Sequence, residues 1–206
     1  MTLQLEPYVG EPDVERFKAA LKGGKLDRVP NFENLVDDQH VAKLLGREAG
    51  NTMAYGGDPA KGASGATGRP MLAQDLLEFC TIIGQDVMTV EALWTPLKRR
   101  EPDGTVVPAM DRRVHSRADW DALIKPSDAD IEDRLQYVRE YKQAASGSRM
   151  GVMILGGCIF QTLYEFVVGL SDMMMMCYEQ RDLVEEMLDV SADFYERMVA
   201  VAVAEG

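Results

Sequence analysis

Residues 151–161 read GVMILGGCIFQ, a short apolar run that stops at Gly156 and Gly157. Helical spacing begins directly after these glycines, and no second strand of a hairpin follows. A strand that passes through a glycine turn into a helix is a βα unit, and ligands usually bind at the strand end of such units. Glycine has no Cβ, so the backbone can bend sharply there and approach a ligand closely, although an ordinary tight turn is the alternative.

Two earlier segments repeat this design. Residues 28–34 (RVPNFEN) predict a short strand, followed by a helix that Asp37 or Asp38 caps. Residues 86–93 (DVMTVEAL) predict a second strand, and the helix before it ends at Gly84. Strand alternating with helix three times along the chain predicts a parallel sheet or barrel.

A β-hairpin is expected between the second and third strands. Residues 97–100 and 106–107 flank the sequence EPDGT, whose residues are typical of a tight turn. The first helix is predicted to place Val14, Phe17, Ala20 and Leu21 inward. Helix starts are predicted at Asp13, at Ser116, at Ser127 or Asp128, at Ser171, and near Asp182 for a last helix that runs to Glu205.

Length and composition favour one globular domain over residues 1–206, with 46% hydrophobic and 27% charged residues. A formal charge of −12 disfavours nucleic acid or an anionic membrane as a partner, because phosphate groups would be repelled. No apolar run reaches the roughly 18 residues of a membrane span. Three widely spaced cysteines and two histidines, without a CxxC pair, predict reduced thiols, a cytoplasmic location and no structural zinc.

Residues 50–70 are rich in glycine and other small residues and contain almost no large apolar side chains. Such a segment buries too little surface to offset the entropy of ordering it. We therefore expect a flexible glycine-rich loop, with a lid over a cleft as the alternative.

The order of these elements resembles the N-terminal half of the uroporphyrinogen decarboxylase superfamily. This superfamily contains the haem-pathway decarboxylase and the cobalamin-dependent methyltransferases, which move methyl groups between a corrinoid protein and a thiol or folate acceptor. The resemblance lies in ERFKAAL at 15–21, DRVP at 27–30, the strand that ends at Glu91, the hairpin, ILGGC at 154–158 and CYEQRDLV at 177–184.

The resemblance implies an eight-stranded (β/α) barrel with additional N-terminal helices. A closed barrel typically needs about 250 residues. The expected fold class is therefore α/β, a partial TIM-type barrel with about three parallel strands, a small β-hairpin and N-terminal helices. An open edge after the third strand would favour a homo-oligomer or a partner that supplies the missing half.

The resemblance also implies site residues. The decarboxylase binds substrate carboxylates through arginines after its first strand, but residues 31–38 here read NFENLVDD, and a polyanionic tetrapyrrole would be repelled. Glu91 corresponds to its aspartate above the pyrrole nitrogens, and Glu165, or Tyr164 with a one-residue slip, to its site tyrosine. We expect Glu91 to be catalytic.

For Glu33 and Glu91, the alternative is that they are polar strand ends bonded to neighbouring loops. The expected substrate-binding residues are Glu33, Asn34, Gln161, Tyr164 and Glu165.

The resemblance to the methyltransferase branch implies methyl transfer between a corrinoid protein and a small thiol or folate acceptor. That branch activates the thiol with a zinc bound by a His-x-Cys pair and a later cysteine in its C-terminal half, so we expect no cofactor in this chain itself. Cys158 then corresponds to a small turn residue. Decarboxylation of a porphyrinogen is one alternative. Another is a non-catalytic half-barrel that assembles through its open edge and the helix with Met173–Met176.

Overall fold

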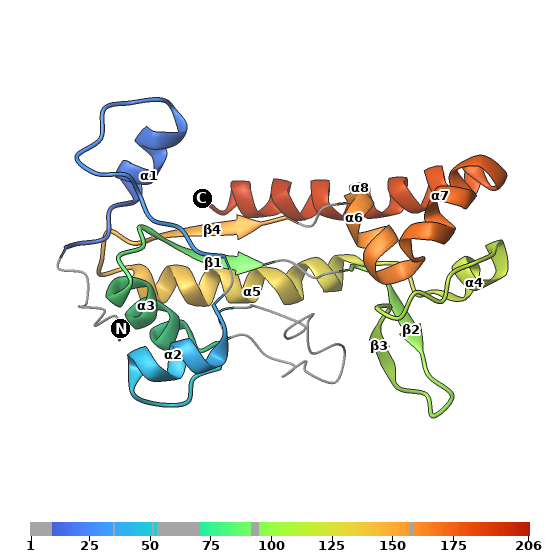
Figure 1. Cartoon of the computed structure of the whole chain (residues 1–206), viewed down its shortest axis with the longest axis horizontal. Helices are drawn as coiled ribbons and strands as arrows, with labels where there is room; N and C mark the ends of the chain where they lie inside the picture. The colour runs from blue at the N-terminus through green and yellow to red at the C-terminus, as the bar shows by residue number, and fades with distance from the viewer. Residues whose placement is uncertain (1–9, 35, 51, 53–70, 92–94, 157–158) are drawn as a thin grey trace, which may run out of the picture. The chain divides into compact units, whose positions relative to one another are not determined.

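The computed structural model describes residues 10–34, 36–50, 52, 71–91, 95–156 and 159–206 (Figure 1). The chain forms two compact units, which we describe separately. The first unit consists of Met1–Glu91 and Gln136–Leu155, and the second of Ala92–Leu135 and Gly156–Gly206. The single domain expected over residues 1–206 stays a prediction, and most of the expected glycine-rich loop at 50–70 lies outside the described residues.

A two-stranded parallel sheet lies at the centre of the first unit. Strands β1 (Val87–Glu91) and β4 (Gly151–Leu155) pair in register from one end to the other, and Figure 1 shows them side by side. Val87, Met88 and Val90 are buried, as an apolar β-strand between covering layers requires. The sequence prediction of these two strands and of their parallel direction is confirmed.

The strand predicted at residues 28–34 is reduced to a single parallel bridge between Asn31 and Gln85. Pro30 has no N–H and cannot continue a ladder of hydrogen bonds. Asn31 is instead held by its side chain, whose Nδ2 donates to the carbonyl oxygen of Ile83 at 2.9 Å. The expected three parallel strands are therefore corrected to two strands and one bridge, and the sheet of the described residues does not close into a barrel.

The first unit also contains three short helices. They are α1 (Val14–Leu21), α2 (Asp38–Leu45) and α3 (Ala73–Ile82). The carboxylates of Asp13 and Asp37 accept from backbone N–H groups of the first turns of α1 and α2, so both predicted caps are confirmed. Leu21 is 76% exposed, however, so the prediction that it faces inward is wrong.

Close packing fixes the point where β4 begins. A Cβ added at Gly151 would lie 2.4 Å from Cγ2 of Val14 and 3.1 Å from Cγ1 of Val87. The N–H of Val14 donates to the carbonyl oxygen of Arg149 at 2.9 Å, which brings the start of α1 to this place. Gly151 therefore allows helix α1 and strand β1 to approach β4 closely.

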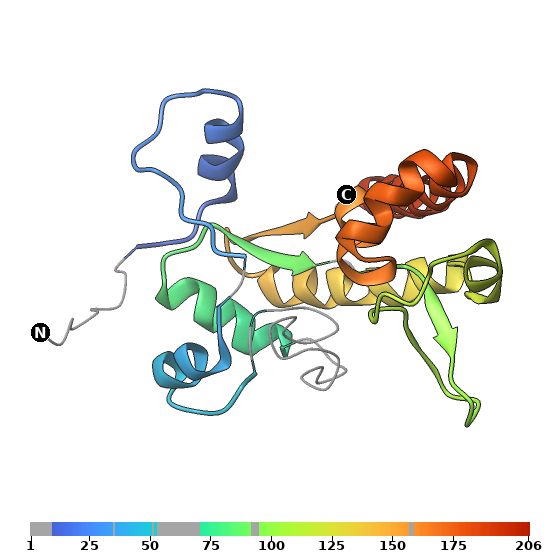
Figure 2. The same ribbon diagram turned by 45° about the vertical axis from the view of Figure 1, so that its right-hand side comes forward.

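The second unit contains the predicted hairpin and a group of helices. Strands β2 (Lys98–Arg100) and β3 (Val106–Pro108) pair in antiparallel fashion, which confirms the hairpin (Figure 2). Ser116 caps α4, as predicted. The helices are α4 (Arg117–Ala122), α6 (Ile159–Thr162), the π-helix η3 (Leu163–Val167), α7 (Leu170–Glu179) and α8 (Arg181–Ala204), while α5 (Asp128–Ala145) has residues in both units.

The four consecutive methionines of α7 divide between core and surface. Met173 and Met176 are buried against the core of the second unit, whereas Met174 and Met175 are 41% and 55% exposed. Helix α7 begins at Leu170 after Gly169, whose φ of 105° breaks the preceding helix, so the predicted cap at Ser171 is wrong. Within the described residues, no helix has the length and apolar character needed to cross a membrane.

Candidate functional site

The carboxyl ends of β1 and β4 form the first part of the candidate site. Both strands stop at the same level, because Glu91 pairs with Leu155, and Gly156 follows directly. Glu91 therefore ends a parallel strand, the position at which carboxylates contribute to sites in βα folds. The side chain of Glu91 lies outside the described part of the chain, as do Gly157 and Cys158.

Glu33 and Asn34 lie in the segment that follows the bridge at Asn31, and both are exposed. Their backbone carbonyl groups make hydrogen bonds within the fold. The carbonyl oxygen of Glu33 accepts from Nε2 of the buried Gln85 at 3.1 Å, and the carbonyl oxygen of Asn34 accepts from Oγ1 of Thr52 at 3.4 Å. Anchoring through the backbone leaves the side-chain carboxylate and amide at the surface, where a ligand can reach them.

Gln161, Tyr164 and Glu165 lie together on the continuous helical stretch of α6 and η3 in the second unit. Nε2 of Gln161 donates to Oε2 of Glu165 at 2.7 Å. The ring of Tyr164 meets that of Phe160 edge to face, with centroids 5.6 Å apart. The predicted site residues thus fall into two groups, with Glu33, Asn34 and Glu91 in the first unit.

The π-helix is a feature that the sequence did not predict. The N–H of Val168 donates to the carbonyl oxygen of Leu163, five residues earlier, at 2.8 Å. A π-helical turn contains one residue more than an α-helical turn. Helical spacing over only eight residues does not reveal this extra residue, because apolar side chains still recur every three to four positions. Such turns occur frequently at functional sites, and this one contains Tyr164 and Glu165.

A charged cluster at the opposite, amino-terminal end of β1 was also missed. The Asp86 side chain is fully buried, and its Oδ1 accepts from Nη1 of Arg16 at 2.5 Å and from Nη2 of Arg28 at 2.8 Å. Arg16 also binds Asp27 through two parallel bonds of 2.7 and 2.9 Å. These bonds from Arg16 lower the pKa of Asp27 to about 2. In a βα fold this end of a strand serves stability rather than chemistry.

This Arg16–Asp27–Arg28–Asp86 cluster gives a physical role to two motifs of the sequence. ERFKAAL and DRVP contribute the two arginines and Asp27, and Asp86 stands one residue before β1. The sequence shows charged residues beside apolar ones in both motifs. It does not show that the two arginines share Asp86 as a partner.

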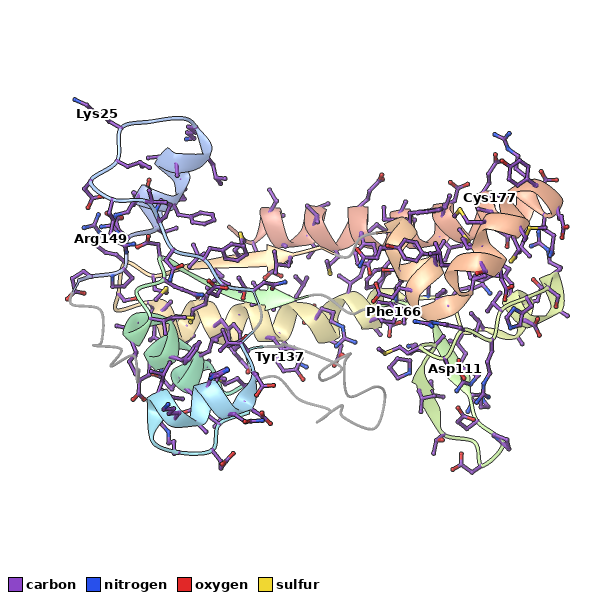
Figure 3. All side chains as sticks on the ribbon, in the orientation of Figure 1. Lys25, Asp111, Tyr137, Arg149, Phe166 and Cys177 are labelled. Carbon is purple, nitrogen blue, oxygen red and sulfur yellow. The ribbon has the colours of Figure 1, made fainter. Side chains whose placement is uncertain are left out.

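A pocket in the second unit has an apolar floor formed by Ala109, Leu123 and Val167. Its charged rim is neutralised internally, because the carboxylate of Asp111, which is labelled in Figure 3, pairs with both Arg99 and Arg113. We therefore assign it no charged ligand. Among the described residues, no three His, Cys, Asp or Glu side chains gather closely enough to hold a metal ion, so we assign no zinc ligand either.

Comparison with known proteins returned no relative: no protein-family model matches the chain, and neither the curated proteins nor the solved structures gave a significant match. The resemblance to the decarboxylase superfamily therefore depends on the motifs and their order alone.

Proposed function

We propose that this chain is part of a (β/α) barrel of the uroporphyrinogen decarboxylase type, and that it takes part in methyl transfer between a corrinoid protein and a small thiol or folate acceptor. The chain order of the parallel segments supports the barrel. Asn31 pairs with Gln85 just before β1, and β1 pairs with β4. Each parallel segment thus lies beside the next one in the sequence, as the strands of a (β/α) barrel do.

The positions of the arginines support methyl transfer rather than decarboxylation. Arg28 and Arg47 are the arginines nearest in sequence to residues 31–38. Arg28 is bound to Asp86 at the amino-terminal end of β1, and Arg47 pairs with Asp75 and Glu78 of helix α3. Glu33 and Asn34 are exposed, and the resemblance aligns them with the substrate-binding guanidinium groups of the decarboxylase. A substrate with many carboxylates would be repelled there, whereas a small acceptor with polar or cationic atoms would be attracted.

In this proposal, the acidic side chains orient the acceptor. Glu91, Glu33 and Asn34 hold its polar atoms in the first unit. Gln161, Tyr164 and Glu165 are the substrate-binding residues that we assign to the second unit. The acceptor sulfur forms a bond to the methyl carbon while the carbon–cobalt bond breaks, its electron pair stays on cobalt, and the thiol proton is released. We assign activation of the thiol to no residue of this chain.

The test uses methylcobalamin as donor and 2-mercaptoethanol as acceptor, with zinc in the medium, and follows the visible spectrum of the corrinoid. We expect transfer that falls at least tenfold in Glu91→Gln and is unchanged in Glu48→Gln, which alters an exposed acid outside the candidate site. A parallel assay with uroporphyrinogen should show no consumption. Consumption of uroporphyrinogen without methyl transfer would replace this proposal with decarboxylation.

The second candidate is a non-catalytic half-barrel that assembles with another chain or with a second copy. The outer face of α7 supports it, because Leu170, Met175 and Tyr178 are 57%, 55% and 89% exposed. Apolar side chains gathered on one helix face are typical of protein contacts. Sedimentation at micromolar concentration should then show a dimer or larger species if the partner is a second copy, and a monomer would rule out this self-assembly.

A further inference from the structure

The end of the π-helix η3 leaves backbone carbonyls without donors from its own helix. Gly169, with its φ of 105°, interrupts the chain before α7 begins at Leu170. The last carbonyl groups of any helix lack intrahelical partners and need donors from elsewhere. Here these are the carbonyls of Glu165, Phe166 and Val167, of which Phe166 is labelled in Figure 3.

Residues 112–114 supply a donor to each of these three carbonyls in turn. Nε of Arg112 donates to the carbonyl oxygen of Glu165 at 2.7 Å, and the backbone N–H of Arg112 donates to that of Phe166 at 2.9 Å. The N–H of Val114 donates to the carbonyl oxygen of Val167 at 3.2 Å. A short segment between β3 and α4 therefore completes the end of the π-helix.

Arg112 adopts an unfavourable backbone conformation to do this. Its φ is 58°, and among the described residues no other residue except glycine has a positive φ. Side chains with a Cβ rarely adopt this left-handed region, and strained residues cluster where the surrounding structure requires them. A glycine would adopt this φ without strain and would keep the backbone donor. Arginine adds the side-chain hydrogen bond to the carbonyl oxygen of Glu165.

We propose that Arg112 is a positioning residue for Tyr164 and Glu165, an assignment that rests on the proposed function because that function gives both residues to the substrate. The donors of residue 112 hold the turn in its π form. If the turn relaxed to an α-helix, the register would slip by one residue and the side chains would rotate by about 100°. Tyr164 and Glu165 would then point in new directions, and the buried Leu163, Phe166 and Val167 of the same turn would have to repack.

The first test needs no ligand. Amide exchange of Val168 reports directly on the bond to Leu163 that defines the π turn. In Arg112→Gly, glycine suits the φ of 58° and keeps the backbone donor but removes the side-chain donor. We expect Val168 to exchange at least tenfold faster and the nuclear Overhauser contacts between the rings of Phe160 and Tyr164 to weaken.

Two further variants control this result. Arg113→Gly removes the neighbouring guanidinium, which pairs with Asp111 rather than with the π-helix, and should leave Val168 exchange unchanged. Arg112→Lys keeps a flexible donor and should restore part of the protection. Equal Val168 exchange in wild type and Arg112→Gly would overturn the proposal, and so would a loss that Arg113→Gly reproduces.

The second test measures transfer from methylcobalamin to 2-mercaptoethanol. We expect Arg112→Gly and Glu165→Gln each to lower kcat/KM at least tenfold, and a normal value for Arg112→Gly would mean that Arg112 has a purely structural role. If the wild type transfers no methyl group, the proposed function fails. Val168 exchange and the ring contacts would still decide whether Arg112 fixes the π turn.

Discussion

Nη1 of Arg16 lies 2.5 Å from Oδ1 of Asp86, a carboxylate without exposed surface. Arg28 donates to the same oxygen atom, and so does the backbone N–H of Asp13 at 2.9 Å. One carboxylate thus joins the cap of α1, the body of α1 and the segment that leads to Asn31. This relationship attaches the N-terminal part of the first unit to the start of β1.

Replacement of Asp86 by alanine should destabilise the first unit severely. Two guanidinium groups, of side chains that are 10% and 23% exposed, would lose their common partner, and breaking a buried ion pair from one side costs about 3 kcal/mol or more. Urea denaturation measures this loss. Glu15→Gln, in an exposed pair with Lys18, serves as the control and should change stability by about 0.5 kcal/mol or less. A loss of less than about 1 kcal/mol in Asp86→Ala would contradict the prediction.

The ion pair of Asp27 should make stability depend on acid. Bonds from Arg16 lower the pKa of Asp27 from 3.8 to about 2 in the folded chain. A group with a lowered pKa stabilises the fold above its unfolded pKa, and this stabilisation disappears as the pH falls through the folded value. The urea midpoints of wild type and Asp27→Asn should therefore differ near pH 6 and converge between about pH 4 and 2. A difference that is as large at pH 2 as at pH 6 would show that the ionised carboxylate of Asp27 is not the cause.

Gly151→Ala should destabilise the first unit because its new methyl group would collide with Val14 and Val87. Crowding of this kind in a packed interior typically costs about 1–3 kcal/mol. Gly147→Ala is the matched control, since a Cβ at that position meets nothing within 4 Å. Thermal unfolding should show a lower midpoint for Gly151→Ala and an equal or higher one for Gly147→Ala. Equal midpoints for the two variants would mean that Val14 moves aside without cost.

Two cysteines should differ sharply in their reaction with a thiol reagent. Cys80 is 1% exposed, and burial raises its pKa to about 12, whereas Cys177 is partly accessible. The thiolate is the reactive form, so Cys80 should react only after unfolding. A Cys158→Ser variant contains only these two thiols. Under native conditions, one thiol per chain, that of Cys177, should react with the reagent. Peptide mapping that finds the label on Cys80 would refute the burial of α3.

Local signals in the sequence predicted most elements of the fold. The carboxylates of Asp13 and Asp37 and the hydroxyl of Ser116 cap helices as expected, since a cap depends on neighbours a few residues away. The apolar runs of β1 and β4 were equally clear. The π turn and the Asp86 cluster escaped prediction because both depend on partners distant in the chain: Arg112 is 53 residues from Glu165, and Arg16 is 70 residues from Asp86.

The candidate site was predictable only in part, for the same reason. Gln161 and Glu165 stand four residues apart on one helix, so their contact follows from helix geometry. Glu33 and Asn34 depend instead on the segment after Pro30, where the strand expected from apolar residues gave way to a single bridge. Their placement depends on long-range folding, which local spacing does not report.

The methionine run of α7 also gives this helix two chemical sides. Peroxide reaches exposed thioethers first, so Met174 and Met175 should become sulfoxides while the buried Met173 and Met176 stay reduced. Each sulfoxide replaces an apolar contact surface with a polar one. Mild oxidation, measured as a mass gain of one oxygen atom per outer methionine, should thus make the outer side of this helix more polar and leave its buried side unchanged.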